Sequence, residues 1–531
     1  MNNHPIVFVA FTQSDNLGVG YLVSALSEAG YQSLIIDFQS GKEEILKTLK
    51  RIKPLVMGFS VIFQYHIYEF KKLINYLRES GITSHFTAGG QYASMRYADL
   101  FKLIPSLNSI VRFEGEYTFL ELVNCIYSGV DWQEIKGLAY KRNGKIIANP
   151  LRPPEMDLDK FPFPMRLSFK EYALDKQFAT LIASRGCLNN CSFCNNREYI
   201  KQSSVFFKRI RKPEKVVSEM QFLHYKMDCS VFLFEDDDFP VKAEKGSDWI
   251  ERFCYELKRK KLVDKIMWKI NCRPDEIDYK RFTLMKDHGL YLVFLGIDDG
   301  TNIGLTRLNK HMTIKETLKG IDILKRVEIG FDYGFMLFQP ASTFRSIYDN
   351  LEFLEQLCGD GYTPVTFLKL KPYFDTRVEK ELLEEGRLVG KPGFLDYDFL
   401  NNSLNHYYSF IRDSFMEWLN DPDGFVNISK WARNYLSVFS HFFKITPNVQ
   451  SLSAEVKKSI ANGNLFFLDT MKELAIIFES GKYDQGKNGS LTSYKKNIVK
   501  NHAQFKEQIS NSIDKIWRLA EYQKLLQLIK Y

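Results

Sequence analysis

Short apolar runs that alternate with glycine-containing turns and helical patterns fill the first 125 residues of the chain. Apolar runs of this length, bounded by turn residues, are typical of buried strands. Strands separated by helices pair in parallel, because the helix carries the chain back to the starting edge of the sheet. The runs lie at residues 6–11, 33–37, 55–61, 84–88 and 109–113. The sequence therefore predicts an α/β protein with an N-terminal doubly wound, Rossmann-like parallel sheet.

The same alternation returns from Phe178, after a stretch of different character. Residues 131–172 hold the hairpin signal Asn143-Gly144 and several prolines, which indicates an ordered linker. Beyond it, further apolar runs with helical patterns between them predict a central partial βα barrel of the TIM type. They lie at residues 180–184, 231–234, 266–271, 291–296, 333–337 and 366–370.

A chain of 531 residues needs more than one core, since single hydrophobic cores stop growing at about 250–300 residues. After residue 375 the pattern becomes helical, with Ile509, Ile513 and Ile516 at helical spacing. We expect a helical C-terminal domain that closes the barrel mouth and selects the substrate. The predicted divisions are 1–130 for the first sheet, 131–172 for the linker, 173–375 for the barrel and 376–531 for the helical domain.

The composition favours a globular protein of the cytoplasm. Lys and Arg number 72 against 64 Asp and Glu, and this small excess is spread along the chain, so we expect no nucleic-acid partner. The N-terminal apolar run is too short for a signal peptide. No run approaches the roughly 20 apolar residues that cross a bilayer, so we expect no transmembrane segment.

Three of the eight cysteines, Cys187, Cys191 and Cys194, lie within eight positions directly after a predicted strand. Thiolates spaced by three and then two residues can hold a 4Fe-4S cubane and leave one iron open. The loop after a strand is also where barrel enzymes place their chemistry. The alternatives are structural zinc, which normally has a fourth Cys or His nearby, and three merely buried cysteines. We predict that the three cysteines are metal ligands.

With Phe193 in the aromatic position, this segment resembles the Cys-x3-Cys-x-aromatic-Cys motif of the radical S-adenosylmethionine (SAM) superfamily. The resemblance covers about residues 175–375. It implies that the open iron binds the amino and carboxylate groups of SAM, and that the reduced cluster cleaves SAM to a 5′-deoxyadenosyl radical. It also implies an electron donor such as flavodoxin or ferredoxin.

The resemblance places further SAM contacts at the ends of successive strands. Asp236 and Asp237 would accept hydrogen bonds from the methionine ammonium, and Arg273 would pair with the methionine carboxylate. Asp298 stands where relatives carry a longer Glu. A solvated acidic turn and a surface arginine are the competing interpretations. The implied SAM contacts are Phe193, Asp236, Asp237, Arg273 and Asp298.

The first 125 residues resemble the cobalamin-binding domain that precedes many radical SAM cores. The resemblance rests on glycine-containing turns after four of the five predicted strands, where the backbone can approach a corrin closely. It implies cobalamin contacts from Asn16, Leu17, Gly18, Val19, Gly20, Ser60, Gly89, Gly90, Gln91, Glu114, Gly115 and Glu116.

Leu17 stands where the Asp-x-His-x-x-Gly motif of many cobalamin proteins has its histidine. Radical methylases of this class commonly lack that histidine, and we expect cobalamin without a protein histidine ligand to cobalt. The same absence would follow if the domain had kept its fold and lost cobalamin.

The resemblance implies a cobalamin-dependent radical SAM methyltransferase that methylates an unactivated carbon through a 5′-deoxyadenosyl radical and methylcobalamin. One alternative is a radical SAM cyclase, rearrangement or elimination enzyme without methyl transfer. Another is a cobalamin or redox sensor. Methylthiotransferases carry a second cysteine set, but residues 1–130 hold only Cys125. The expected substrate is a small molecule, a lipid or a peptide.

Overall fold

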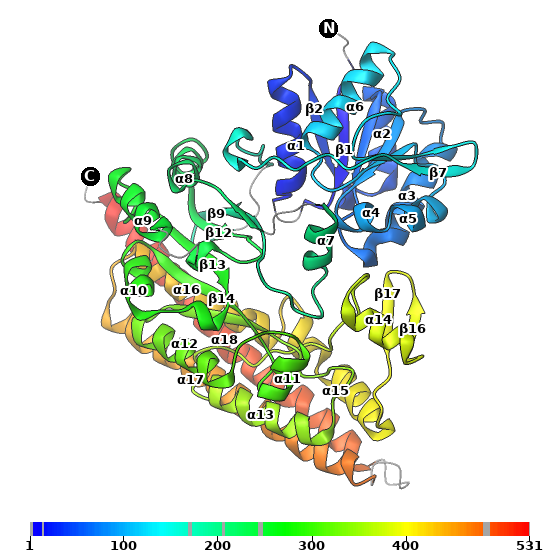
Figure 1. The fold of residues 1–531 in the computed structure, drawn as a ribbon. Coiled ribbons are helices and arrows are strands. Elements are labelled where there is room, and N and C mark those ends of the chain that lie inside the picture. The colour runs from blue at the N-terminus through cyan, green and yellow to red at the C-terminus, as the bar shows by residue number, and fades with distance from the viewer. Residues whose placement is uncertain are drawn as a thin grey trace.

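The computed structural model describes residues 4–12, 15–167, 172–203, 208–242, 248–481 and 489–529. Two α/β units lie side by side, and a set of long helices packs along the second unit (Figure 1). The predicted fold class is confirmed, with a Rossmann-like sheet, a partial barrel and a helical C-terminal part. Within these described ranges, no helix combines the length and apolar character that a membrane span requires.

The first unit is built on a seven-stranded sheet. Its strands are β1 (Ile6–Ala10), β2 (Ser33–Asp37), β3 (Val56–Ser60), β4 (His85–Gly89), β5 (Ser109–Val111), β6 (Leu138–Arg142) and β7 (Lys145–Ala148). They are arranged in the order β2-β1-β3-β4-β5-β6-β7, and the first five run parallel, as predicted. The order reverses between β1 and β3, which opens a crevice at the carboxyl ends of the strands.

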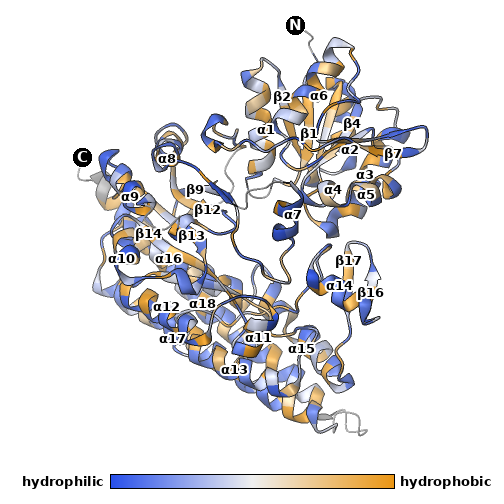
Figure 2. Ribbon diagram, in the orientation of Figure 1, coloured by the Kyte–Doolittle hydropathy of each residue, from blue (hydrophilic) through white to orange (hydrophobic). Residues whose placement is uncertain are grey.

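Helices cover both faces of this sheet. They are α1 (Leu17–Glu28), α2 (Lys42–Ile52), α3 (Ile67–Glu79), α4 (Gln91–Met95), α5 (Tyr97–Leu103) and α6 (Glu116–Ser128). Successive side chains of a strand point to opposite faces. Phe8 therefore packs in the cluster that includes α1 and α6, whereas Val7 and Val9 pack in the cluster that includes α2 and α3. Figure 2 shows the largely hydrophobic strands enclosed by these helices.

The predicted Asn143-Gly144 hairpin is formed by β6 and β7. Both turn residues have positive φ, +52° and +75°, as a two-residue hairpin turn requires. Because β6 also pairs antiparallel with β5, the first sheet extends past residue 130 into the range expected to be a linker. The part of that range at residues 168–171 lies outside the described residues.

The second unit holds a six-stranded sheet. Its strands are β8 (Tyr172–Ala173), β9 (Lys176–Leu181), β12 (Cys229–Phe234), β13 (Met267–Cys272), β14 (Leu290–Asp298) and β15 (Gly330–Phe335). The order is β15-β14-β13-β12-β9-β8, with β8 as an antiparallel edge and the other strands parallel. The connecting helices are α8 (Pro213–Met227), α9 (Trp249–Arg259), α10 (Tyr279–Asp287), α11 (Asn302–Arg307), α12 (Ile314–Val327) and α13 (Phe344–Cys358).

The sixth predicted strand of the barrel, residues 366–370, pairs only in part with the chain at the end of β15. The amide of Leu368 donates to the carbonyl of Phe335, and the amide of Leu370 donates to the carbonyl of Phe338, both at 2.8 Å. A single parallel bridge joins Lys369 to Phe338 beyond the end of β15. The amide of Thr366 donates to the hydroxyl of Tyr333 at 3.1 Å. Because a side chain takes this amide, it does not join the ladder that a strand beside β15 would need.

Two small hairpins stand apart from the large sheets. One consists of β10 (Ser184–Gly186) and β11 (Lys208–Ile210), and the chain between them carries α7 (Asn195–Ser203). The other consists of β16 (Leu388–Lys391) and β17 (Phe394–Tyr397), after α14 (Arg377–Glu384). Figure 1 shows α7 between the two α/β units.

The C-terminal part is helical, as predicted. Its helices are α15 (Asn402–Asn420), α16 (Phe425–Phe442), α17 (Pro447–Glu479) and α18 (Gly489–Ile529). Ile509 and Ile516 are buried in a hydrophobic cluster that also contains the strands of the second sheet. The helices and the barrel therefore share one core.

These helices contact both ends of β15. Arg433 on α16 pairs with Asp332 at 2.8 Å, near the amino end of β15. Tyr407 on α15 packs against Phe338, just beyond the carboxyl end, with ring centroids 5.9 Å apart. α15 therefore lies near the carboxyl end of β15 and α16 near its amino end, and closure of the barrel mouth stays a prediction.

Candidate functional site

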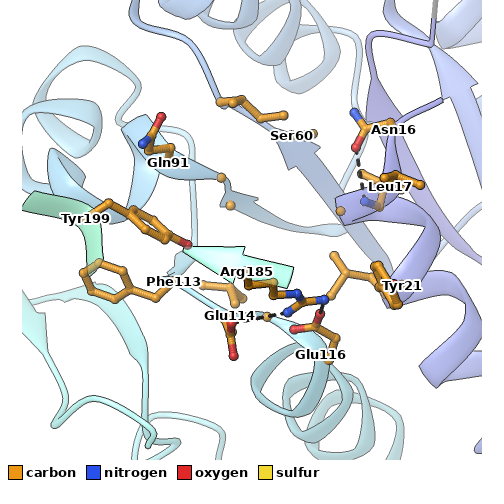
Figure 3. Close-up of a pocket in the computed structure, with 18 of the residues that line it drawn as sticks. Asn16, Leu17, Tyr21, Ser60, Gln91, Phe113, Glu114, Glu116, Arg185 and Tyr199 are labelled. Atoms are coloured by element: carbon orange, nitrogen blue, oxygen red, sulfur yellow. Dashed lines mark hydrogen bonds and ion pairs between the residues drawn. The ribbon is translucent and has the colours of Figure 1, made fainter. Parts of the chain in front are cut away.

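A cavity of about 400 Å³ opens at the carboxyl edge of the first sheet. The turns after β1, β3, β4 and β5 form one wall, and β10, α7 and the residues after β12 form the other. The cavity therefore lies between the two α/β units, at the crevice that the strand order creates. Figure 3 shows side chains that face it from both units.

Asn16 fixes the turn after β1. Its Oδ1 accepts a hydrogen bond from the amide of Val19 at 3.2 Å, and its Nδ2 donates to the carbonyl of Phe11 at 3.3 Å. Asn is a preferred N-cap because its side chain satisfies an amide that the first helical turn leaves free. The cap sets the start of α1, where Leu17 and Gly18 border the cavity.

The Gly89-Gly90 turn brings the ends of β3 and β4 together. Gly90 has a φ of +105°, and a Cβ at this position would lie 2.8 Å from the carbonyl oxygen of Val61. Glycine alone adopts this backbone conformation readily. As a result, Ser60, Gly89 and Gln91 border the same part of the cavity.

Glu114, on the turn after β5, and Glu116, at the start of α6, meet two arginines of the second unit (Figure 3). Arg185 pairs with Glu114 at 3.3 Å and with Glu116 at 2.7 Å. Arg209 also pairs with Glu114. Burial raises the pKa of Glu114, but the guanidinium groups outweigh burial, so that its pKa is lowered overall. The wall of the cavity is therefore an ion-pair network that joins the two units.

All but one of the residues predicted to contact cobalamin border this cavity. They are Asn16, Leu17, Gly18, Val19, Ser60, Gly89, Gly90, Gln91, Glu114, Gly115 and Glu116. Gly20 is the exception, because it faces the chain that leads to the second unit. A Cβ on Gly20 would lie 2.5 Å from the carbonyl oxygen of Met165, so this glycine permits a close backbone contact.

The sequence prediction missed what the second unit contributes to the cavity. Arg185, Tyr199 and Arg209 border it, and Tyr199 packs against Phe113 with ring centroids 5.1 Å apart. Arg185 stands two residues before Cys187, so its place beside the motif was a usable signal. Tyr199 and Arg209 carry no such signal, because only the folded chain brings them to the cavity.

The three predicted metal ligands lie on the loop between β10 and α7. Cys187, Cys191 and Cys194 are partly exposed, whereas the cysteines of the strands and helices behind them are buried. Burial raises the pKa of Cys194 to about 12, and the neighbouring thiols of Cys191 and Cys187 add to the effect. Metal binding requires the thiolate, so loading this site would release protons.

The loop is anchored at its centre. The amide of Ser192 donates to the carbonyl of Leu308 at 3.0 Å, and the Nδ2 of Asn309 donates to the carbonyl of Asn190 at 2.6 Å. Asn189 directs its amide and its Nδ2 at the Cys187 sulfur, both at 3.4 Å. Such donors suit a thiolate ligand, because hydrogen bonds to cluster sulfurs tune the reduction potential.

Within the described residues, no group of three or more His, Cys, Asp or Glu side chains is arranged to hold a single metal ion. The ligands of a cubane stand further apart than those of one ion, because each thiolate binds a different iron. Three thiols on one anchored, half-buried loop therefore fit a 4Fe-4S cluster.

The two predicted acidic SAM contacts after β12 have different surroundings. Asp236 accepts hydrogen bonds from the amide of Ala183, at 3.0 Å and 3.1 Å, and from the hydroxyl of Ser184 at 2.5 Å. Burial raises the pKa of Asp236 to about 7. The exposed side chain of Asp237 instead borders the cavity and accepts from the Nδ2 of Asn196 at 2.6 Å.

Arg273 and Asp298 gather near Cys191, together with Lys310. Lys310 pairs with Asp298 at 2.6 Å, and its carbonyl accepts from Arg273 at 2.5 Å. Burial raises the pKa of Cys191, Lys310 and Arg273 oppose the rise, and Asp298 adds to it. Phe193 is partly buried against the core of the second unit. The structure thus places opposite charges beside the middle cysteine.

Comparisons with known proteins assign the two units to families. Residues 3–123 match the B12 binding domain, and residues 181–354 match the radical SAM superfamily. The first range includes β1 to β5, and the second includes β12 to β15 with the cysteine loop.

Two curated relatives and one solved structure extend these matches. The chain is 28% identical over 418 residues to the anaerobic magnesium-protoporphyrin IX monomethyl ester cyclase of Rubrivivax gelatinosus, over 74% of this chain and 73% of that protein. It is 27% identical over 380 residues to an uncharacterised methyltransferase of Pyrococcus horikoshii, over 70% of this chain and 79% of that protein. The structure of the cobalamin-dependent SAM radical enzyme OxsB with aqua-cobalamin and SAM bound matches with a TM-score of 0.67 and 18% identity, over 99% of this chain and 80% of that chain.

The family matches confirm the predicted cofactor set of a 4Fe-4S cluster, SAM and cobalamin. They also agree with the geometry, because one cavity is bordered by both turns of the unit that matches the B12 binding domain and segments beside the cysteines. The chain is therefore a cobalamin-dependent radical SAM enzyme, a member of the radical SAM superfamily with an N-terminal B12-binding domain.

Proposed function

We propose that this enzyme methylates an unactivated carbon of its substrate, with cobalamin as the methyl carrier. The observation that carries the proposal is the shared cavity without an imidazole. Leu17 borders it at the position of the missing histidine, and the described lining residues include no histidine. Cobalt held there would lack a strong lower ligand, which favours release of a methyl radical. When bound, the cluster with SAM would supply the hydrogen-abstracting radical, and methylated cobalamin would supply the methyl group.

Different residues of this chain would bind the cluster and cobalamin. We assign Cys187, Cys191 and Cys194 to the cluster, and the cavity turns of the first unit to cobalamin. The Gly89-Gly90 turn supports this assignment, since both glycines border the cavity and present backbone to it without a side chain.

The charges near Cys191 would orient SAM. Arg273 and Lys310 suit the methionine carboxylate, and Asp298 suits the ammonium group. We assign Asp237 to the same pocket because its side chain is exposed there. Asp236 has a supporting role in the proposal, since its oxygens already hold the start of β10 and the residue before it to the end of β12.

The surface of the second sheet supports a partly apolar substrate. Phe294 on β14 exposes 38% of its surface, and the Lys269 Nζ lies 5.9 Å from its ring centroid. Lys269 also pairs with Glu235 at 3.5 Å. An aromatic surface beside an ion pair would suit a small molecule, lipid or peptide side chain with both apolar and polar parts.

A second candidate function is cyclisation without methyl transfer. It is favoured by the match to the anaerobic magnesium-protoporphyrin IX monomethyl ester cyclase, which covers 74% of this chain. The same cofactor site would serve, and the products formed from SAM would differ.

Those products give the test. The protein is reconstituted anaerobically with iron, sulfide and hydroxocobalamin, then reduced with SAM present, with a chemical reductant replacing the flavodoxin or ferredoxin that we propose as donor in the cytoplasm. We expect both 5′-deoxyadenosine and S-adenosylhomocysteine, and loss of 5′-deoxyadenosine in Cys191→Ala. Deoxyadenosine without S-adenosylhomocysteine, in a protein that retains cobalamin, would overturn methylation and favour cyclisation.

A further inference from the structure

Two residues that bracket the cysteine loop bond across the cavity to the first unit. Arg185 stands two positions before Cys187, and Asn196 stands two positions after Cys194. Arg185 pairs with Glu114 on the turn after β5 and with Glu116 at the start of α6. Asn196 accepts from Gln91 on the turn after β4. Both ends of the loop are thus held by turns that border the cavity.

The side chain of Asn196 makes two directed contacts at once. Its Oδ1 accepts from the Nε2 of Gln91 at 2.6 Å, and its Nδ2 donates to the Oδ1 of Asp237 at 2.6 Å. The donors and acceptors of an amide side chain are distinct, so this one residue, two positions after Cys194, has a fixed orientation between the first unit and the end of β12.

Arg185 is held as firmly on the other side of the loop. Besides its two carboxylate partners, its guanidinium group lies 4.9 Å from the ring centroid of Tyr21 and 5.1 Å from that of Phe161. Figure 3 shows Arg185 beside Tyr21 and directed at both glutamates. A planar, doubly paired and stacked guanidinium has little freedom to move independently of its partners.

We propose that Arg185 and Asn196 are positioning residues that couple cobalamin occupancy to the electronic environment of the cluster. The proposal rests on the proposed placement of both cofactors. Cobalamin in the cavity would touch the turns that carry Gln91 and Glu114. Any shift of those turns is transmitted to the loop, and hydrogen bonds to thiolate ligands tune cluster potentials.

Coupling of this kind is reciprocal. If cobalamin changes the stability of one cluster redox state, that redox state changes cobalamin affinity by the same factor. Typical coupling corresponds to about a 5- to 150-fold change in affinity, which is large enough to measure at equilibrium.

The test uses the full chain with its cluster reconstituted. The midpoint potential of the cluster is measured by EPR-monitored titration with and without Co(II) cobalamin, and the affinity for Co(II) cobalamin is measured for the oxidised and the reduced cluster. We expect cobalamin to shift the potential of the wild-type protein, and its affinity to differ about five-fold or more between cluster states. Gln91→Ala and Asn196→Ala should each reduce this ratio towards one, and the double variant should lose no more than the larger single loss, because both remove the same contact.

Lys201→Ala is the matched control, since this side chain lies on α7 and is 67% exposed. It should keep the wild-type ratio. If Asn196→Ala fails to hold a cluster, the affinity ratio can still be measured in Gln91→Ala, which removes the same hydrogen bond from the first unit. A wild-type ratio of one, or an unchanged ratio in Gln91→Ala, overturns the coupling and leaves the methylation proposal standing. Intact coupling without formation of S-adenosylhomocysteine would overturn methylation alone.

Discussion

At the residue scale, Leu17 is the position at which the proposed cobalamin site differs from sites that supply a histidine to cobalt. It borders the cavity at the start of α1, where an imidazole would point into the same space (Figure 3). In Leu17→His with Co(II) cobalamin bound, we expect EPR splitting from one nitrogen and reduced methyl transfer. Leu17→Asn should show no such splitting. A Leu17→His protein that binds cobalamin without the nitrogen signal would contradict this placement.

Gly90 sets the geometry of the turn between β4 and α4. Its φ of +105° and the carbonyl of Val61, 2.8 Å from any added Cβ, leave no room for alanine. Gly90→Ala should cost about 3 kcal/mol or more, from strain and collision together, and should weaken cobalamin binding. Gly129→Ala is the control, because Gly129 has a φ of +67° and nothing within 4 Å of an added Cβ. It should cost about 1 kcal/mol and leave cobalamin binding intact, as urea unfolding and cobalamin titration will show.

His85 makes the first unit sensitive to acid. Burial, with a contribution from Arg78, lowers the pKa of His85 from 6.5 to about 4. Between pH 6.5 and pH 4, His85 is therefore protonated in the unfolded chain but neutral in the folded chain. Its contribution to the free energy of unfolding is complete above pH 6.5 and decreases as the pH drops towards 4. We expect a loss of up to about 3 kcal/mol from this residue, measured as the urea midpoint at several pH values. His85→Gln should flatten the pH dependence, and an identical profile would refute the role of His85.

At the scale of elements, Asn464 on α17 ties the C-terminal helices to the chain after α13. Its Nδ2 donates to the carbonyls of Cys358 and Thr363, and its Oδ1 accepts from the amide of Val365 at 2.8 Å. Asn464→Leu would leave the Thr363 carbonyl and the Val365 amide without these partners, whereas the Cys358 carbonyl keeps the amide of Gly361, and the change should cost about 2 kcal/mol or more. Asn462→Leu, at an exposed position of the same helix, should be nearly neutral in the same urea unfolding measurement.

The contacts of this segment also show where sequence prediction ends. The strands of both sheets follow from apolar runs and turn residues, because burial and backbone geometry act locally. The expected strand at residues 366–370 has the same apolar character, but Thr366 gives its amide to Tyr333. Pairing with a distant side chain leaves no periodic signal in the sequence.

The residues of the candidate site also fall into two groups: those that the sequence predicted and those that only the folded chain brings to the cavity. Glycine turns at strand ends predicted the cavity wall of the first unit, because Gly90 needs a conformation that other residues avoid. Gly20 lies in the same kind of glycine-containing segment, but it permits a close backbone contact with Met165 and does not border the cavity. Tyr199 reaches the cavity only because α7 lies between the two units. Residues brought in from a second unit require the fold to be known.

At the scale of the whole molecule, contacts on separate turns hold the two units around the cavity. The Arg185 network lies at the turn after β5. Near the segment that leads to α14, Arg96 pairs with Asp375 at 3.1 Å and with Glu379 at 3.3 Å. Gln64 adds a hydrogen bond from the amide of Phe374 at 3.2 Å. The opening between the units is therefore set from more than one direction.

Loosening the Arg96 contact should speed the escape of cobalamin, because the second unit supplies one wall of the cavity. Arg96→Ala removes a partly buried charge that has two partners, and a loss of about 1.4 kcal/mol would raise the dissociation rate about ten-fold. The rate is measured by trapping released cobalamin from the loaded protein. Arg345→Ala is the control, since Arg345 is 84% exposed and pairs with Asp349 on its own helix. An unchanged rate in a folded Arg96→Ala protein would show that the Arg185 network and the turns of the first unit hold cobalamin without help from the far side.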